Sequence, residues 1–333
     1  KFVRLKRRLS ETEISQVRGL ALEAPFKPER RSPQPRIGLV TEYERQYPHG
    51  TSFAHGGGFE SEDPGHHEGL ERVLDEYLTR VDRLVPVARD GKRQQMGSSS
   101  IALSGAEAIL TVDLLLQKVV EEELDAACAE FRPQWATVIV MDPRTGAILA
   151  LANRPTFDPN HPGRSPAESR QNRAVAAPYE PGSTLKPFTA AYALDLGLLK
   201  PGSRIDCEMG LWKHGPRILH DHHPYGTITL SDVIKFSSNI GAAKIGALTL
   251  GRNRLHECMA AWGFGSRTGV DLASEDDGRL FPLSKWTLYS DTSVPMGHEI
   301  SVTPLQLATA MSAIANGGTL LKPYSVRRIV STD

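Results

Sequence analysis

Regular patterns of hydrophobic and polar positions begin near residue 109. After Asp113, apolar residues recur at helical spacing through Leu116, Val120 and Leu124, which predicts a helix with Asp113 as its N-cap. Two apolar runs, ATVIVMD and AILALAN, follow and are joined by PRTG. They predict an antiparallel hairpin with Gly146 in the left-handed region of the turn. Such a hairpin implies a sheet whose faces are covered by helices.

Two further helices are marked by their ends. One is predicted from Ser183 to about Leu196, with Gly197 as its stop. The other lies in TPLQLATAMSAIANGG, where Thr303 is the N-cap, Pro304 takes the first helical position and Gln306 completes a capping box. The glycine pair at the end of this segment terminates the helix.

The first 108 residues have a different composition. They are rich in charged and turn-forming residues, including the run KPERRSPQPR and the loop HGGGFESEDPGHHEG, and only short segments such as Leu70 to Leu78 carry helical periodicity. Such a region buries little core by itself. We therefore predict an accessory domain over 1–108 and a second domain over 109–333.

Charge and cysteine content narrow the function classes. The 39 basic residues balance the 39 acidic ones, so no net charge points to nucleic acid or an anionic surface. The three cysteines have no C-x-x-C spacing and predict neither a disulfide framework nor a thiolate metal site. No stretch approaches 18 consecutive apolar residues, and the chain of 333 residues begins on Lys1. We expect it to be a portion of a longer protein.

Two short motifs offer nucleophile chemistry. In EPGSTLKPF, Ser183 precedes Lys186 by one helical turn, so the amine can reach the hydroxyl and take its proton. The alternative is that Ser183 is only a helix N-cap. Downstream, Ser237 and Asn239 form an S-x-N motif between two predicted helices, where capping is again the alternative. Penicillin-recognising serine acyltransferases carry S-x-x-K followed by S-x-N in this order.

With these motifs, the chain resembles the class B penicillin-binding proteins, the peptidoglycan D,D-transpeptidases of cell division and elongation. YERQYPHG resembles the family's amino-terminal pedestal. The transpeptidase domain is matched by LTVDLLLQ, MDPRTGAILALANRPTFDPN, NRAVAAPYEPGSTLKPF, SSNIGAAKIG, WGFGSRTGVDLASE and ISVTPLQLATAMSAIANGG. The resemblance implies an α/β (α+β) fold in which helices sandwich a mainly antiparallel sheet, preceded by an extended pedestal domain.

The resemblance also implies roles for the four residues. Ser183 is the acylated nucleophile, Lys186 takes its proton, Ser237 passes a proton to the leaving D-alanine, and Asn239 binds the substrate backbone and helps to hold Lys186. A neutral Lys186 requires a desolvated site that lowers its pKa. The backbone N–H of Ser183, at a helix N-terminus, suits half of an oxyanion hole.

The family further implies partners and a location. Its substrates are peptidoglycan stem peptides ending in D-Ala-D-Ala, it is acylated by β-lactam antibiotics, and we expect a membrane glycosyltransferase and division or elongation proteins as partners, with no nucleic acid. The domain is expected outside the bacterial cell membrane, in the periplasm, held by an N-terminal anchor. No cofactor or metal is expected, and HDHHP (220–224) is interpreted as an exposed loop between strands.

One departure from the family pattern leaves alternatives open. The family's K-T-G box, which binds the substrate carboxylate and whose strand supplies the second oxyanion donor, does not occur in these 333 residues. We expect it beyond Asp333; a natural truncated pseudoenzyme is the alternative. A β-lactam-hydrolysing or D,D-carboxypeptidase relative and a non-catalytic penicillin-binding sensor are the other functions considered.

Overall fold

The computed structural model describes residues 5–7, 9–19, 39, 44–61, 67–79, 81–84, 100–103 and 105–331. The chain divides into two compact units, Lys1–Gln46 and Tyr47–Asp333. In the first unit, α1 (Glu11–Gly19) begins with a reciprocal cap: Ser10 Oγ accepts the Glu13 N–H at 3.3 Å, and the Glu13 carboxylate accepts the Ser10 N–H at 2.9 Å. The run KPERRSPQPR lies outside the described residues, and the predicted domain boundary after residue 108 stays a prediction.

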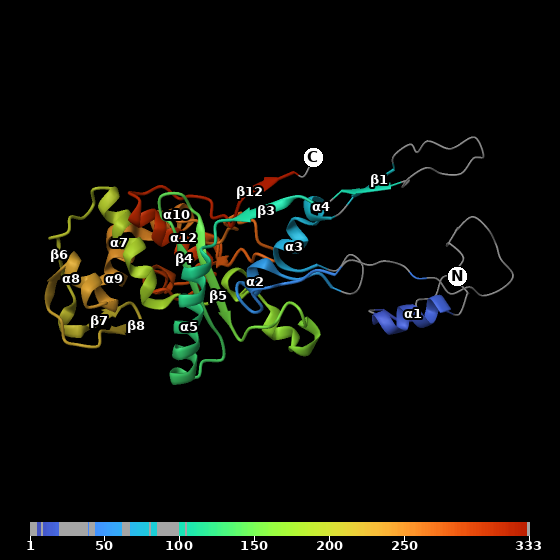
Figure 1. Ribbon diagram of the computed structural model, residues 1–333. Coiled ribbons are helices and arrows are strands. Elements are labelled where there is room, and N and C mark those ends of the chain that lie inside the picture. Colours follow the sequence, from blue (N-terminus) through green and yellow to red (C-terminus); the bar gives the residue numbers. More distant parts are fainter. Residues whose placement is uncertain are drawn as a thin grey trace. The chain divides into compact units, whose positions relative to one another are not determined.

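The second unit mixes short helices with antiparallel strand pairs (Figure 1). Its strands pair as β1 (Val81–Leu84) with β2 (Ser100–Leu103), β3 (Glu107–Leu110) with β12 (Val326–Val330), β4 (Ala136–Met141) with β5 (Ile148–Arg154), β6 (Arg204–Asp206) with β9 (Thr227–Thr229), β7 (Leu211–His214) with β8 (Arg217–His220), and β10 (Arg279–Leu280) with β11 (Ile300–Ser301). Its helices are α2 (Ala54–Gly57), α3 (Gly69–Val73), α4 (Asp75–Leu78), α5 (Leu114–Phe131), α6 (Arg173–Ala176), α7 (Lys186–Asp195), α8 (Leu230–Lys235), α9 (Asn239–Lys244), α10 (Gly251–Ala261), α11 (Ser290–Ser293) and α12 (Pro304–Ala315).

The predicted hairpin is confirmed as β4 and β5. Gly146 has φ of 82° in the connecting turn, where Asp142 accepts hydrogen bonds from the Arg144 N–H and the Thr145 hydroxyl, both at 3.0 Å. The helical segment predicted from Leu70 to Leu78 is confirmed as α3 and α4, which meet at Leu74. No helix among the described residues is long and apolar enough to cross a membrane.

Helix α5 covers one face of the β4–β5 hairpin. As predicted, Asp113 caps it by accepting the N–H groups of Leu115 and Leu116 at 2.9 and 3.0 Å. Val120 and Leu124 of α5 pack with the small residues Ala150 and Ala152 of β5, and the partly buried residues of β4 on this face are Ala136, Val138 and Val140. The side chain of Gln117 also bonds both backbone groups of Leu151, at 2.8 and 2.9 Å.

Helix α12 covers the opposite face. Leu305 of α12 lies in the same buried cluster as Ile148 and Leu151, together with the alternate β4 residues Ile139 and Met141. Its capping box is present as predicted, with Thr303 Oγ1 accepting from Gln306 N and Gln306 Oε1 accepting from Thr303 N. The strand pair is therefore sandwiched by helices, which confirms the predicted fold class.

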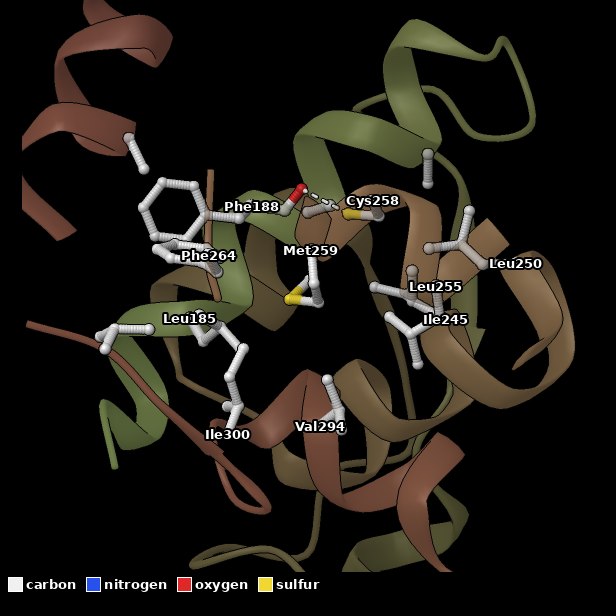
Figure 2. Packing of buried hydrophobic residues seen from close by; sticks show 14 of the residues in the cluster. Leu185, Phe188, Ile245, Leu250, Leu255, Cys258, Met259, Phe264, Val294 and Ile300 are labelled. Atoms are coloured by element: carbon white, nitrogen blue, oxygen red, sulfur yellow. Dashed lines mark hydrogen bonds between the residues drawn. The ribbon is translucent and has the colours of Figure 1, made fainter. Parts of the chain in front are cut away.

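A second apolar core joins α7, α8, α10 and the 3₁₀ turn Val294–Met296. Figure 2 shows Leu185 and Phe188 in this core, with Phe188 beside Phe264 and with Met259 between Leu185 and Cys258. Phe188 is fully buried and packs edge-on against Trp262 and Phe264, with ring centroids 5.3 Å away in each case. This core fixes α7, the helix that begins at Lys186.

Candidate active site

Ser183 lies on a 3₁₀ turn, Gly182–Leu185, that runs directly into α7. The first turn of the predicted helix is thus 3₁₀ and not α, and the helix ends near Leu196, before Gly197 with φ of 66°. The N-cap positions of the turn and of α7 are Pro181 and Leu185, and neither makes a side-chain cap bond. Capping is therefore not the role of the Ser183 hydroxyl, which lies on an exposed residue.

Lys186 is almost wholly buried, with 2 % of its surface exposed. Its Nζ donates to the Ser237 carbonyl at 2.6 Å, to Ser237 Oγ at 2.9 Å and to Asn239 Oδ1 at 2.8 Å. An ammonium group has three protons, so these three acceptors use all of them. The structure thus places the lysine of the S-x-x-K motif in hydrogen-bond contact with both predicted residues of the S-x-N motif, Ser237 and Asn239.

The S-x-N motif occupies a sharp connection between two helices. Helix α8 starts with a capping box between Thr229 and Asp232 and ends before Ser237, which has φ of 56°. Ser238 then caps α9 by accepting the Gly241 N–H at 2.9 Å. The capping alternative is therefore correct for Ser238, the middle residue, whereas the side chains of Ser237 and Asn239 contact Lys186.

Asp221 holds this motif and was not anticipated as a site residue. Its carboxylate accepts the Ser238 hydroxyl at 2.6 Å and the N–H groups of Asn239 and Ile240 at 2.5 and 3.0 Å. A carboxylate at the N-terminus of a helix is favoured by the helix dipole. Asp221 precedes Ser238 by 17 positions, so no local sequence pattern links them.

The loop that carries Asp221 otherwise matches its sequence interpretation. It follows β8 and leads to β9, and its histidines His222 and His223 are exposed, as is His220, the last residue of β8. The backbone carbonyl of His220 accepts from Asn239 Nδ2 at 3.1 Å, which orients the amide so that its oxygen faces Lys186. Within the described residues, no group of three His, Cys, Asp or Glu side chains could hold a metal ion.

The surroundings of Lys186 make it a candidate base. Burial lowers its pKa from 10.5 to about 8, an effect that the negative charge of Asp221 partly opposes. At pH 7 about a tenth of the molecules would then carry a neutral amine. A neutral amine donates two hydrogen bonds and accepts one, so it can take a proton from a hydroxyl.

Comparison with known proteins identifies the family. Residues 136–333 match the model of the penicillin binding protein transpeptidase domain. The chain is 34% identical over 325 residues to the probable peptidoglycan D,D-transpeptidase PenA of Neisseria gonorrhoeae, covering 96% of this chain and 53% of the relative. It is 31% identical over 297 residues to the peptidoglycan D,D-transpeptidase FtsI of Escherichia coli, covering 89% and 50%.

Solved structures of penicillin binding proteins also resemble this chain. Penicillin binding protein 3 of Mycobacterium tuberculosis, in its apo form, matches with a TM-score of 0.74 and 29% identity over 86% of this chain and 62% of that one; the same protein has been solved with aztreonam and with ampicillin. The chain belongs to the family of penicillin binding protein transpeptidase domains. The resemblance drawn from its sequence motifs is thereby confirmed. The chain spans about half the length of the curated relatives it matches.

Proposed function

We propose that this chain carries out the acyl transfer of a peptidoglycan D,D-transpeptidase, with Ser183 as nucleophile. The observation that carries the proposal is the buried Lys186 amine, which donates hydrogen bonds to Ser237 and Asn239. In the sequence, Lys186 follows Ser183 by one helical turn. The lowered pKa of that amine and the uncapped hydroxyl of Ser183 support these roles for the two residues. Family membership and the names of the relatives support the same chemistry.

The first half of the reaction forms an ester. Ser183 Oγ attacks the carbonyl between the two terminal D-alanines, and its proton passes to the neutral amine of Lys186. The carbon–nitrogen bond then breaks, and Ser237 gives its proton to the departing amine while Lys186 replaces it. The backbone N–H of Ser183 stabilises the oxyanion. The second donor is expected from the strand that carries the family's K-T-G box.

In the second half, the amine of a neighbouring stem peptide attacks the ester. The proton returns from the amine to Ser183 Oγ, and a cross-link replaces the D-alanine. Asn239 holds the substrate backbone and Lys186 throughout. A β-lactam antibiotic would acylate the same hydroxyl and leave a bulky group that blocks the acceptor.

We also propose the cellular setting that such a reaction requires. Peptidoglycan lies outside the bacterial membrane, so the domain would work in the periplasm, held by a membrane anchor. Residues 1–108 would form a pedestal for the transpeptidase domain, 109–333. A membrane glycosyltransferase and division or elongation proteins would be its partners, because new glycan strands must be supplied where they are cross-linked.

A fluorescent penicillin tests the nucleophile in the full-length gene product. We expect stable labelling that Ser183→Ala abolishes, and a slowing of acylation by roughly two to four powers of ten in Lys186→Ala, the usual effect of a positioned general base. Rapid release of the label would instead identify a β-lactam-hydrolysing relative. Stable labelling without cross-linking of stem peptides would identify a sensor, and normal labelling of Ser183→Ala would disprove the assignment.

A further inference from the structure

The turn that carries Ser183 is bound along its leading side to a distant segment, 297–302. Tyr179 and Val302 exchange two backbone hydrogen bonds, at 3.0 and 2.9 Å. Three residues further on, the Gly182 N–H donates to the Gly297 carbonyl at 3.1 Å. The residue directly before the nucleophile is thus held by backbone more than 100 positions away.

Gly297 makes this contact possible. It is buried, with φ of 83°, and a Cβ at this position would come within 2.0 Å of the Gly182 carbonyl oxygen and 2.5 Å of the Gly182 nitrogen. Both neighbours are backbone atoms, which cannot rotate away as a side chain can. Only glycine allows the two chains to approach this closely with that backbone conformation.

Glu180 fastens the same two segments through its side chain. One carboxylate oxygen accepts the Glu299 N–H at 3.1 Å, and the other lies 3.0 Å from His298 Nδ1. The hydrogen bond from His298, followed by that from the Glu299 N–H, lowers the pKa of Glu180 against the opposing effect of burial. The Glu299 carboxylate in turn accepts the Ser290 hydroxyl at 2.5 Å, which ties this turn to α11.

We propose that Glu180 and the turn Gly297–Glu299, here called the clasp, position Ser183 relative to Lys186. Lys186 is already fixed by three acceptors. Ser183 is itself exposed and lies before α7, on a turn that has no side-chain cap and is buried only at its last residue, Leu185. Together with the backbone pair of Tyr179 and Val302, the clasp restrains this turn from its leading side. Glu180 is therefore a positioning residue, and its effect on the reaction rests on the proposed function.

Two variants of the full-length gene product test the clasp, with Glu208→Gln as matched control. Glu208 is another partly exposed carboxylate, paired with Lys244 at 2.7 Å and remote from the Ser183 turn in sequence. Because a displacement of about 1 Å can cost roughly a hundredfold in rate, we expect the acylation rate constant to fall about tenfold in Glu180→Gln and about a hundredfold in Gly297→Ala. The dissociation constant for the noncovalent penicillin complex should not change.

Backbone hydrogen exchange supplies a readout that does not depend on activity. We expect faster exchange in residues 180–186 of Glu180→Gln and no change in Glu208→Gln. Unchanged exchange and acylation in Glu180→Gln, with a wild type that labels on Ser183, would overturn the clasp and leave the nucleophile in place. A weaker noncovalent complex at an unchanged rate constant would also overturn it, since Glu180 would then be a substrate contact.

The remaining outcomes separate the two proposals. A wild type that does not label would overturn the proposed function, and with it the effect of the clasp on rate, while hydrogen exchange would still decide whether Glu180 restrains the turn. If Gly297→Ala does not fold, Glu180→Gln alone decides the matter. An equal loss in Glu208→Gln would show a general charge effect and would overturn the clasp.

Discussion

The two segments that form the candidate site are held by different forces. Past the turn that carries Ser183, α7 is fixed through Phe188, which is fully buried among aromatic and aliphatic side chains. The S-x-N segment also has an apolar anchor in Ile240, but its orientation is set by a half-buried carboxylate, because Asp221 bonds the Ser238 hydroxyl and the first N–H groups of α9. Apolar burial is strong and without direction, whereas hydrogen bonds fix orientation.

This difference separates stability from chemistry. Losing apolar contacts at Phe188 should lower the free energy of unfolding and leave the charge around Lys186 unchanged. Losing the Asp221 charge should disturb Asn239 and the Lys186 pKa together, because Asp221 touches one and acts electrostatically on the other. Substitutions in the two segments can therefore be told apart by which quantity moves.

Phe188→Ala should have the largest effect on stability. Truncating a fully buried phenylalanine leaves a cavity, and we expect a loss of about 3–5 kcal/mol in the free energy of unfolding. Phe131→Ala is the matched control, since Phe131 is 73% exposed at the end of α5 and should change stability by less than about 0.5 kcal/mol. Chemical denaturation followed by fluorescence measures both. Equal losses in the two variants would show that the Phe188 cluster is not what holds α7.

Asp221→Asn should act on rate more than on stability. An amide cannot accept with both of its polar atoms, so one of the bonds to Ser238, Asn239 or Ile240 is lost, and we expect acylation to slow roughly ten- to a hundredfold, in line with a hydrogen bond to a charged group. Asp142→Asn is the control, because Asp142 holds the β4–β5 turn by similar bonds. A normal penicillin acylation rate in Asp221→Asn would show that the motif keeps its geometry without the charge.

Local signals were enough to predict the elements that build the fold. The Asp113 and Thr303 caps and the Gly146 turn each depend on residues within a few positions, and each was confirmed. The same holds for the end of α7 near Gly197. Such features follow from backbone preferences that act over one turn of chain.

The site could be predicted only in part. The meeting of Lys186 with Ser237 and Asn239 was expected from motif order and family resemblance, because no periodicity connects two helices that far apart in the chain. Asp221 and the clasp at Gly297 were missed because each depends on a tertiary approach of segments well separated in sequence. The residues next to Asp221 are histidines, which give no sign of its bond to Ser238. Nothing in the sequence near Gly297 indicates its bond to Gly182.

The pH dependence of acylation tests the smallest expected difference between the two segments, their effect on the Lys186 pKa. Because burial lowers the Lys186 pKa to about 8, the neutral amine should increase about tenfold per pH unit up to that value and then level off. The acylation rate should therefore rise between about pH 6 and 8 and be flat above it, whereas a lysine at its ordinary 10.5 would give a rate that still rises beyond pH 9. Asp221 raises this pKa, so Asp221→Asn should move the midpoint below that of the wild type, and Phe188→Ala should leave it in place. Stopped-flow acylation across this range would measure all three proteins, and a midpoint that does not move in Asp221→Asn would show that its charge does not reach the amine.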